Sequence, residues 1–113
     1  MLRTNKVSSD QWDSKFNQIS QKLENRNIDI EVVAMDLGDQ FAATGVHLKG
    51  LTYEPRDNVI QIASDDFSHI INSPSEVYFT LDEESIESIK SIELIDSEDR
   101  KHIVTFEDAL LLE

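Results

Sequence analysis

The stretch QFAATGVHLKGLTYEP, residues 40–55, carries an apolar alternation that changes face twice. Its apolar positions are, in order, Phe41, Ala43, Val46, Leu48, Leu51 and Tyr53. Each change of parity is a step of three residues that brackets a glycine, first Gly45 and then Gly50. One extra residue beside a glycine is typical of a β-bulge, which bends a strand and re-aims its side chains. The stretch therefore predicts one long, curled strand with both parities facing the core.

This double change of face limits the fold, because a flat sheet buries only one parity of a strand. Strands that curl this strongly belong to strongly bent sheets and to small barrels. The alternative is that Gly45 or Gly50 ends a strand in a loop, which would leave two shorter strands. A flat strand would expose Val46 and Leu48 while it buried Tyr53.

The N-terminal segment has the apolar period of a helix. Its residues at positions i, i+4, i+7 and i+11 are Trp12, Phe16, Ile19 and Leu23. These residues form one apolar stripe on a 3.6-residue repeat, which predicts a helix over about residues 9–25. A helix this short is marginal on its own in water, so we expect Trp12 and Phe16 to be buried against another element.

The remainder of the chain predicts a β-rich body over about residues 28–107. Strands are indicated by β-branched or alternating apolar residues at 28–35, 40–53, 59–64, 76–82, the end of 85–96, and 101–107. Turn chemistry marks residues 37–40, 54–58 and 97–100. The segment 65–74 fits either a helical turn or an irregular edge.

The resulting fold prediction is a single α+β domain over residues 1–113. It consists of an N-terminal amphipathic helix packed on a small, strongly bent antiparallel β-sheet or barrel, with about five strands after the helix. That order of elements is typical of SH3-like and Sm-like small barrels. The last two residues, Leu112 and Glu113, are typical of a cloning scar, so the fold prediction does not use them.

The chain is strongly acidic, with 23 Asp and Glu against 10 Lys and Arg and a net charge of −13. The charge is uneven, because residues 1–27 carry five basic and three acidic side chains and residues 28–113 carry the others. Affinity for nucleic acid comes largely from cations that neutralise phosphates, so we expect no nucleic-acid partner. The acidic body indicates either a well-solvated surface or one that docks on a basic protein.

Two functional classes fit this charge, and an enzyme is kept as a third alternative ranked below them. The first is a small, non-catalytic acidic binding or accessory protein. The second is an acidic inhibitor or immunity-like protein that masks a basic partner surface, and in both classes the partner is another protein. The acidic residues predicted for the partner surface are Asp82, Glu83, Glu84, Glu87, Asp96, Glu98 and Asp99.

The sequence offers little for catalysis. It has no cysteine, which excludes disulfides, thiolate metal sites and thiol catalysis. It also lacks a G-x-S-x-G nucleophile elbow and a glycine-rich phosphate loop. The three histidines, His47, His69 and His102, do not have the spacing of a preformed metal site. We therefore expect no enzyme, no metal and no other cofactor.

Two of the histidines allow a structural and a chemical interpretation. His102 alternates with Val104, which favours a partly buried structural imidazole over a ligand or a base. His69 closely follows Asp65 and Asp66 and could form an acid–imidazole pair with one of them. The alternative is that this segment is a polar loop.

No apolar run in the chain is long enough to cross a bilayer. The basic N-terminus is not followed by the apolar segment of a signal peptide. Together with the absence of cysteine, these features predict a cytoplasmic protein without a membrane partner.

Three segments carry a resemblance to a known family: VVAMDLGDQFAATGVHLKGLTYEPRDNVIQI, HIINSPSEVYF and IELIDSEDRKHIVTF. Across about residues 9–107 the chain resembles a family of small uncharacterised bacterial proteins, a domain of unknown function. In that family a tryptophan-bearing helix precedes an L-x-G-I/L-x-Y-x-P segment, an I-x-x-P-x-x-V segment and a final strand that ends in Phe. The resemblance implies a fold and no activity. A fainter likeness to the Sm fold rests on the order of elements around Gly38 and Gly45, but the basic residues that contact RNA in that fold are missing.

Overall fold

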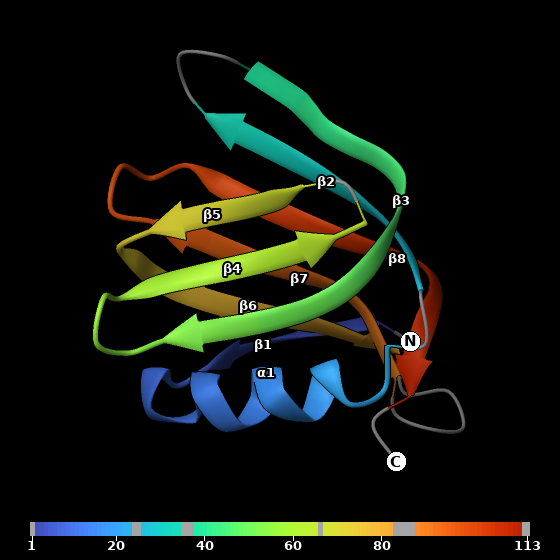
Figure 1. The fold of residues 1–113 in the computed structure, drawn as a ribbon, viewed down its shortest axis with the longest axis horizontal. Helices are drawn as coiled ribbons and strands as arrows, with labels where there is room; N and C mark the ends of the chain where they lie inside the picture. The colour runs from blue at the N-terminus through green and yellow to red at the C-terminus, as the bar shows by residue number, and fades with distance from the viewer. Residues whose placement is uncertain (1, 24–25, 35–37, 66, 83–87, 112–113) are drawn as a thin grey trace.

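A computed structural model describes residues 2–23, 26–34, 38–65, 67–82 and 88–111, and of residues 38–42 it describes the backbone only. In this part of the chain a short helix packs against an eight-stranded sheet (Figure 1). The helical elements are η1 (Ser9–Gln11) and α1 (Trp12–Ser20). The strands are β1 (Leu2–Val7), β2 (Asn27–Ala34), β3 (Gly38–Glu54), β4 (Val59–Ser64), β5 (Ser68–Asn72), β6 (Pro74–Asp82), β7 (Ser88–Asp96) and β8 (Lys101–Leu111).

The sheet is antiparallel throughout, with the strand order β1-β6-β7-β8-β2-β3-β4-β5. The predicted α+β fold with a bent antiparallel sheet is confirmed. The sheet does not close into a barrel, because β1 and β5 stand at its two ends and do not pair with each other. Among the described residues seven strands follow the helix, where about five were expected, and β1 precedes it.

Strand β3 bends the sheet, and both predicted bulges are present. Its first part pairs with β2 and its second part pairs with β4. The register shifts beside Gly45 in the first part and beside Gly50 in the second. Leu48 and Leu51 are both buried although they have opposite parity, which a flat strand does not allow. Phe41 was expected to face the core, but its side chain lies outside the described part of the structure.

The two bulges differ in backbone geometry. Gly45 has a φ of +63°, in the left-handed region that favours glycine. Its backbone N–H donates a 2.7 Å hydrogen bond to Oδ1 of Asp29 on the neighbouring strand. Gly50 does not have a positive φ. Of the two bulges, only the one at Gly45 therefore requires the left-handed backbone conformation.

The predicted helix is confirmed in its position and its apolar face. Trp12, Phe16 and Ile19 are buried, and Leu23 is buried just beyond the helix. The helix ends at Ser20, however, and does not reach residue 25. The Ser20 hydroxyl donates to the carbonyl of Leu51 and accepts from the Leu51 N–H.

The end of the helix is thus fixed on β3, while its start is fixed on β1. The indole Nε1 of Trp12 donates a 3.0 Å hydrogen bond to the carbonyl of Val7 on β1. The same indole meets the ring of Tyr53 on β3 edge to face, with centroids 5.1 Å apart. In Figure 1 the helix accordingly lies along one end of the sheet, beside β1 and the end of β3. It joins two strands that are not neighbours in the sheet.

Strand β1 was not expected from the sequence. It pairs with β6, so a segment at the N-terminus lies beside residues about seventy to eighty positions later. The ambiguous segment 65–74 contains β5, and β8 extends past the predicted residue 107 to Leu111. Residues 38–40 begin strand β3, although a turn was expected there.

Candidate functional site

Strand β5 is an edge strand with an unusual surface. It pairs with β4 on one side, and no described strand pairs with its other side. Its sequence, SHIIN, contains no charged residue and no proline. The side chain of Ile70 is 44% exposed on this strand, and Phe67, just before the strand, is 37% exposed. The strand therefore presents free backbone groups together with apolar side chains.

The opposite face of β5 points into the core. Ile71 is buried and lies opposite Ile60 of β4, and His69 lies opposite the buried Ile62. His69 and Ile71 are two residues apart, as the period of a strand requires for side chains on one face. Ile70 is consequently directed outward.

A hollow of about 220 Å³ separates the end of β5 from the turn between β7 and β8. Its lining residues are Ile70, Asn72, Ser73, Asp96, Ser97, Glu98, Arg100 and His102. The Arg100 guanidinium forms an ion pair with the carboxylate of Glu98 in this lining. The hollow thus has acidic and polar walls with an apolar residue, Ile70, at its border.

The turn that borders this hollow is organised by the carboxylate of Asp96. Its Oδ1 accepts the backbone N–H of Glu98 at 2.9 Å and that of Arg100 at 3.1 Å. The backbone N–H of Asp96 in turn donates to the carbonyl of Arg100 at 3.0 Å. The predicted turn at residues 97–100 is confirmed, and Asp99 takes a φ of +61° within it.

The second oxygen of Asp96 starts a chain of side-chain contacts that leads to β5. Asp96 Oδ2 lies 3.0 Å from Nε2 of His102, and Nδ1 of His102 lies 2.9 Å from Nε2 of His69. Asp96 and His102 are both buried. An ionised carboxylate can only accept, so His102 donates its Nε2–H to Asp96. When His102 is neutral, its Nδ1 therefore accepts the Nε2–H of His69.

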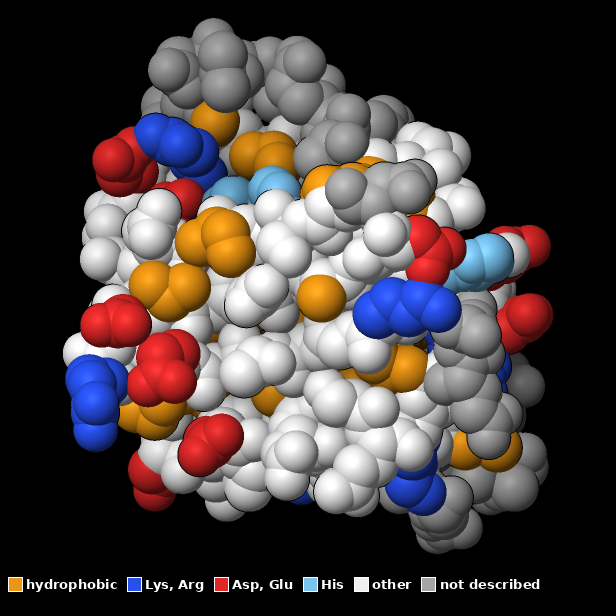
Figure 2. Space-filling view, viewed as in Figure 1, with side chains coloured by type: hydrophobic (Ala, Val, Ile, Leu, Met, Phe, Trp, Pro, Cys, Tyr) orange, Lys and Arg blue, Asp and Glu red, His pale blue; other side chains and the backbone are white. Residues whose placement is uncertain are grey.

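The protonation of His69 follows from its surroundings. Burial lowers the pKa of His69 below its ordinary value, and the neighbouring His102 lowers it further. His69 is therefore neutral at pH 7. The Asp96–His102–His69 chain of hydrogen bonds links the turn and β8 to the edge strand β5. Figure 2 shows histidine side chains just above the position of β5, with hydrophobic side chains beside them.

The chain of contacts does not have the geometry of a known nucleophilic or metal site. Among the described residues, no serine or threonine hydroxyl is hydrogen-bonded to either imidazole. The described residues also contain no group of three or more His, Asp or Glu side chains arranged to hold a metal ion. What the arrangement does provide is a fixed edge strand beside a polar hollow that is lined by charges of both signs.

The predicted partner-surface residues fall into three groups. Glu98 and Asp99 are exposed at the β7–β8 turn, and Asp82 is partly buried at the end of β6. Asp96 is buried, because its carboxylate is directed toward the turn and His102. The remaining residues, Glu83, Glu84 and Glu87, lie outside the described part of the chain.

Of the two interpretations of His69, a pair with Asp65 is wrong and Asp66 lies outside the described residues, while the polar loop is wrong because His69 lies in strand β5. Asp65 pairs with Nδ1 of His47 at 2.8 Å and with Nζ of Lys49 at 3.2 Å. The hydrogen bonds from His47 and then from Lys49 lower the pKa of the Asp65 carboxyl. His69 is directed toward the core on β5, so it cannot reach this exposed cluster.

The expectation that His102 is a buried structural residue is confirmed. The contact between His69 and His102 was missed, because the two residues are 33 positions apart. A signal for it was present. Each histidine alternates with a buried apolar residue, His69 with Ile71 and His102 with Val104, so both point inward once residues 68–72 are read as a strand.

Comparisons with known proteins agree with this fold and assign no activity. A model of a family of unknown function (DUF5335) matches residues 3–113. The chain belongs to this family. It is 31% identical over 112 residues to an uncharacterised protein of Aquifex aeolicus (strain VF5), an alignment that covers 98% of each chain. No solved structure matches the chain. No helix among the described residues of this family member is long and apolar enough to cross a membrane.

Proposed function

We propose that this protein is a small, non-catalytic binding module that receives an extended, basic segment of another protein on the free edge of β5. The observation that carries the proposal is the composition of that edge. An edge strand exposes a row of backbone donors and acceptors, and proteins usually protect such an edge with charged residues or proline. Within β5 neither is present, and Ile70 is exposed.

Strand addition is a common way for a sheet edge to bind a peptide, because main-chain hydrogen bonds supply affinity and side-chain pockets supply specificity. The fixed position of β5 supports this mode. His69 holds the strand from the core side through His102, so little conformational entropy is lost when a partner strand pairs with it.

The charge of the protein supports a basic partner. Residues 28–113 carry twenty acidic and five basic side chains, and the turn beside the hollow at the end of β5 exposes Glu98 and Asp99, with Arg100 paired to Glu98. Complementary charge speeds association and fixes the register of a partner more than it raises affinity. A lysine or arginine of the bound segment would therefore lie at this hollow, while its apolar residues cover Ile70.

A peptide titration followed by amide NMR tests the proposal. The probe is a synthetic peptide in which valine alternates with lysine or arginine, and its control replaces the basic residues with glutamate. We expect the basic peptide to shift the amide signals of β5 and of the β7–β8 turn, and the acidic peptide to leave them unchanged. Equal effects of both peptides, or shifts centred on β1, would refute the proposal.

A pair of variants sharpens this test. Ile70→Lys places a charge on the β5 edge and should weaken binding of the basic peptide about tenfold, as for an interface residue of moderate energy. Leu2→Lys is the matched control, because Leu2 is 60% exposed on the other edge strand, β1. A photo-crosslinking residue in place of Ile70 should capture a basic, extended segment of a cellular protein, while the same residue in place of Leu2 should not.

A further inference from the structure

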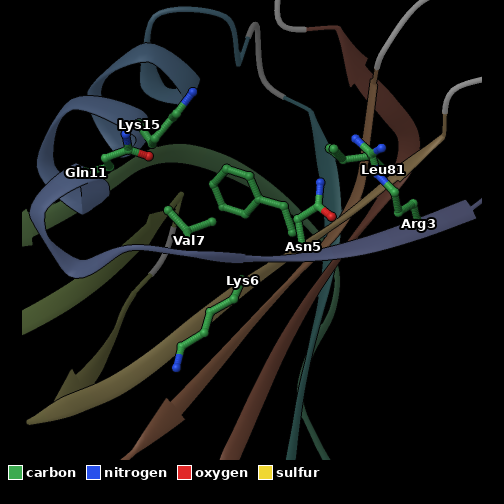
Figure 3. A pocket seen from close by; sticks show the side chains of 8 residues that line it. Arg3, Asn5, Lys6, Val7, Gln11, Lys15 and Leu81 are labelled. Atoms are coloured by element: carbon green, nitrogen blue, oxygen red, sulfur yellow. The ribbon is translucent and has the colours of Figure 1, made fainter.

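A second hollow, of about 290 Å³, lies between β1 and the start of the helix (Figure 3). Its lining residues are Arg3, Asn5, Lys6, Val7, Gln11, Lys15, Phe79 and Leu81. It is at the opposite end of the strand order from β5, and it does not depend on the binding function proposed above. Its volume is close to the lower limit of ordinary small-molecule pockets, about 300 Å³.

The lining has an unusual charge for this chain. Three of its eight residues are basic and none is acidic, although the chain has more than twice as many acidic as basic residues. No described carboxylate lies within ion-pair distance of Lys15. Lys6 is different, because its ammonium lies 3.2 Å from the carboxylate of Glu76.

Strand geometry explains which side chains of β1 face the hollow. Successive side chains of β1 alternate between its two faces, so Arg3, Asn5 and Val7 point toward the helix side and Lys6 points away, as Figure 3 shows. On the helix side, Gln11 and Lys15 are one turn apart and form a second wall. Arg3 and Lys15 therefore come from the two opposite walls of one hollow.

The floor of the hollow is apolar. Leu81 lies opposite Arg3 in the β1–β6 register, and Phe79 lies opposite Asn5. Phe79, Leu81 and Val7 are each 5–7% exposed, so a small part of each side chain reaches the hollow. The hollow thus combines a cationic and amide rim with an apolar base.

We propose that this hollow binds a small amphipathic anion, a carboxylate joined to a short aliphatic chain. The carboxylate accepts from the Lys15 ammonium at the rim, with the amides of Asn5 and Gln11 as further donors. The aliphatic chain covers Phe79 and Leu81. A carboxylate suits the site because its single negative charge can be matched by the cation at the rim. The aliphatic chain of the ligand then stays on the apolar floor.

An NMR titration with three probes tests both halves of the site. Hexanoate should shift the amides of β1, η1 and the first turn of α1, and should saturate with a Kd of about 1 mM or tighter, as expected for so small a ligand. Acetate has the same head without the chain, and hexan-1-ol has the chain without the charge. Each should bind at least about tenfold more weakly than hexanoate, because each loses one class of contact.

The outcomes are distinguishable from one another. If hexanol binds as well as hexanoate, the hollow is an apolar cavity only, and the proposal is wrong. If acetate binds as well as hexanoate, the floor does not take part, which also refutes it. Absence of binding, or shifts centred on β5, would contradict the site altogether.

Variants locate the charge contact. Lys15→Gln should weaken hexanoate binding about tenfold, the loss of one charge-assisted contact. Lys49→Gln is the matched control, because Lys49 is an exposed lysine that pairs with Asp65 on a different part of the sheet. Equal affinities of the two variants would overturn the proposed rim. Neither substitution touches the core, so both proteins should fold.

Discussion

The two edge strands, β1 and β5, occupy equivalent positions at the ends of one sheet and protect their edges differently. β1 carries Arg3 and Lys6 within six residues, and its exposed apolar residue, Leu2, stands at its first position next to Arg3. β5 carries no charge, and its exposed Ile70 is at its centre. Charged side chains on an edge discourage pairing with another strand. Only β5 is therefore suited by its sequence to accept another strand.

The two edges also differ in what holds them to the protein. Next to β1 the helix contributes an apolar stripe, with Phe16 at its centre and Trp12 hydrogen-bonded to Val7. At β5 the link to β8 is polar, through His69 and His102. The β1 edge is therefore stabilised mainly by the hydrophobic effect. The stability of the β5 edge depends in part on the protonation of His69.

The largest effect is expected on the β1 side. Phe16 is fully buried, and Phe16→Ala should lower the free energy of unfolding by about 3–5 kcal/mol, the usual loss for a core aromatic. Urea denaturation measures this, with the exposed Asn17→Ala on the same helix as a control that should change stability by less than about 0.5 kcal/mol. A loss below about 1 kcal/mol would mean that the helix is an appendage and the sheet is stable without it.

The next effect concerns the link at β5. His102→Ala removes the hydrogen bond to Oδ2 of the buried Asp96 carboxylate and the hydrogen bond to the imidazole of His69, which should cost about 2 kcal/mol. His47→Ala is the matched control, because His47 also bonds an aspartate but is exposed. Hydrogen exchange should become faster in β5 and remain unchanged in β1. Equal losses in the two variants would show that the buried chain contributes nothing special.

A smaller difference in stability is expected between substitutions at the two bulges, which lie in the two halves of the sheet. A Cβ added at Gly45 or Gly50 meets no atom within 4 Å, so only the backbone conformation distinguishes them. Gly45→Ala should cost about 1 kcal/mol because its φ is +63°, an unfavourable region for alanine. Gly50→Ala should be within about 0.5 kcal/mol of neutral. Thermal melts of the two variants check this, and a reversed order would contradict the assignment of the bulges.

The smallest effect is a pH dependence confined to the β5 side. His69 has a lowered pKa in the folded protein, so the unfolded chain binds the proton more tightly. The contribution of His69 to the free energy of unfolding is therefore complete above its ordinary pKa of 6.5. This contribution decreases as the pH falls below that value. Thermal melts between about pH 7.5 and 5.5 should show a falling Tm in this direction.

A His69→Gln variant provides the control for this titration. It keeps a polar side chain at the position but cannot take up a proton, so the slope below pH 6.5 should become smaller. Hydrogen exchange should report faster opening of β5 at low pH, with β1 unchanged. A rise in Tm as the pH falls would contradict the neutral state of His69.

The features that the sequence predicted are those with a local signal. The bulges of β3 were visible because parity and glycine positions change within sixteen residues, and the helix was visible because four apolar residues share one face. The turn at Asp96 was visible from its residue types. In each case the physical cause acts between residues close in the chain.

The features that were missed depend on distant residues. β1 has only two apolar residues, Leu2 and Val7, so its strand conformation comes from pairing with β6 rather than from its own pattern. The contact of His69 with His102 requires the bend of β3, which folds β5 back over the sheet. The hollow beside the helix was missed for the same reason, because Phe79 and Leu81 reach it only through the β1–β6 register.

The pairing of β1 with β6 has a consequence for folding during synthesis on the ribosome. Leu2 lies opposite Asp82, so the first strand to be made waits for a partner translated about 4–16 s later at ordinary rates of synthesis. β2 has the same delay before β8, which ends near the C-terminus. Such distant pairings carry a high loop-closure entropy and fold slowly. The β1–β6 and β2–β8 pairings therefore form late, after β6 and β8 have been made, whereas consecutive strands such as β2 and β3, or β3 and β4, can pair earlier.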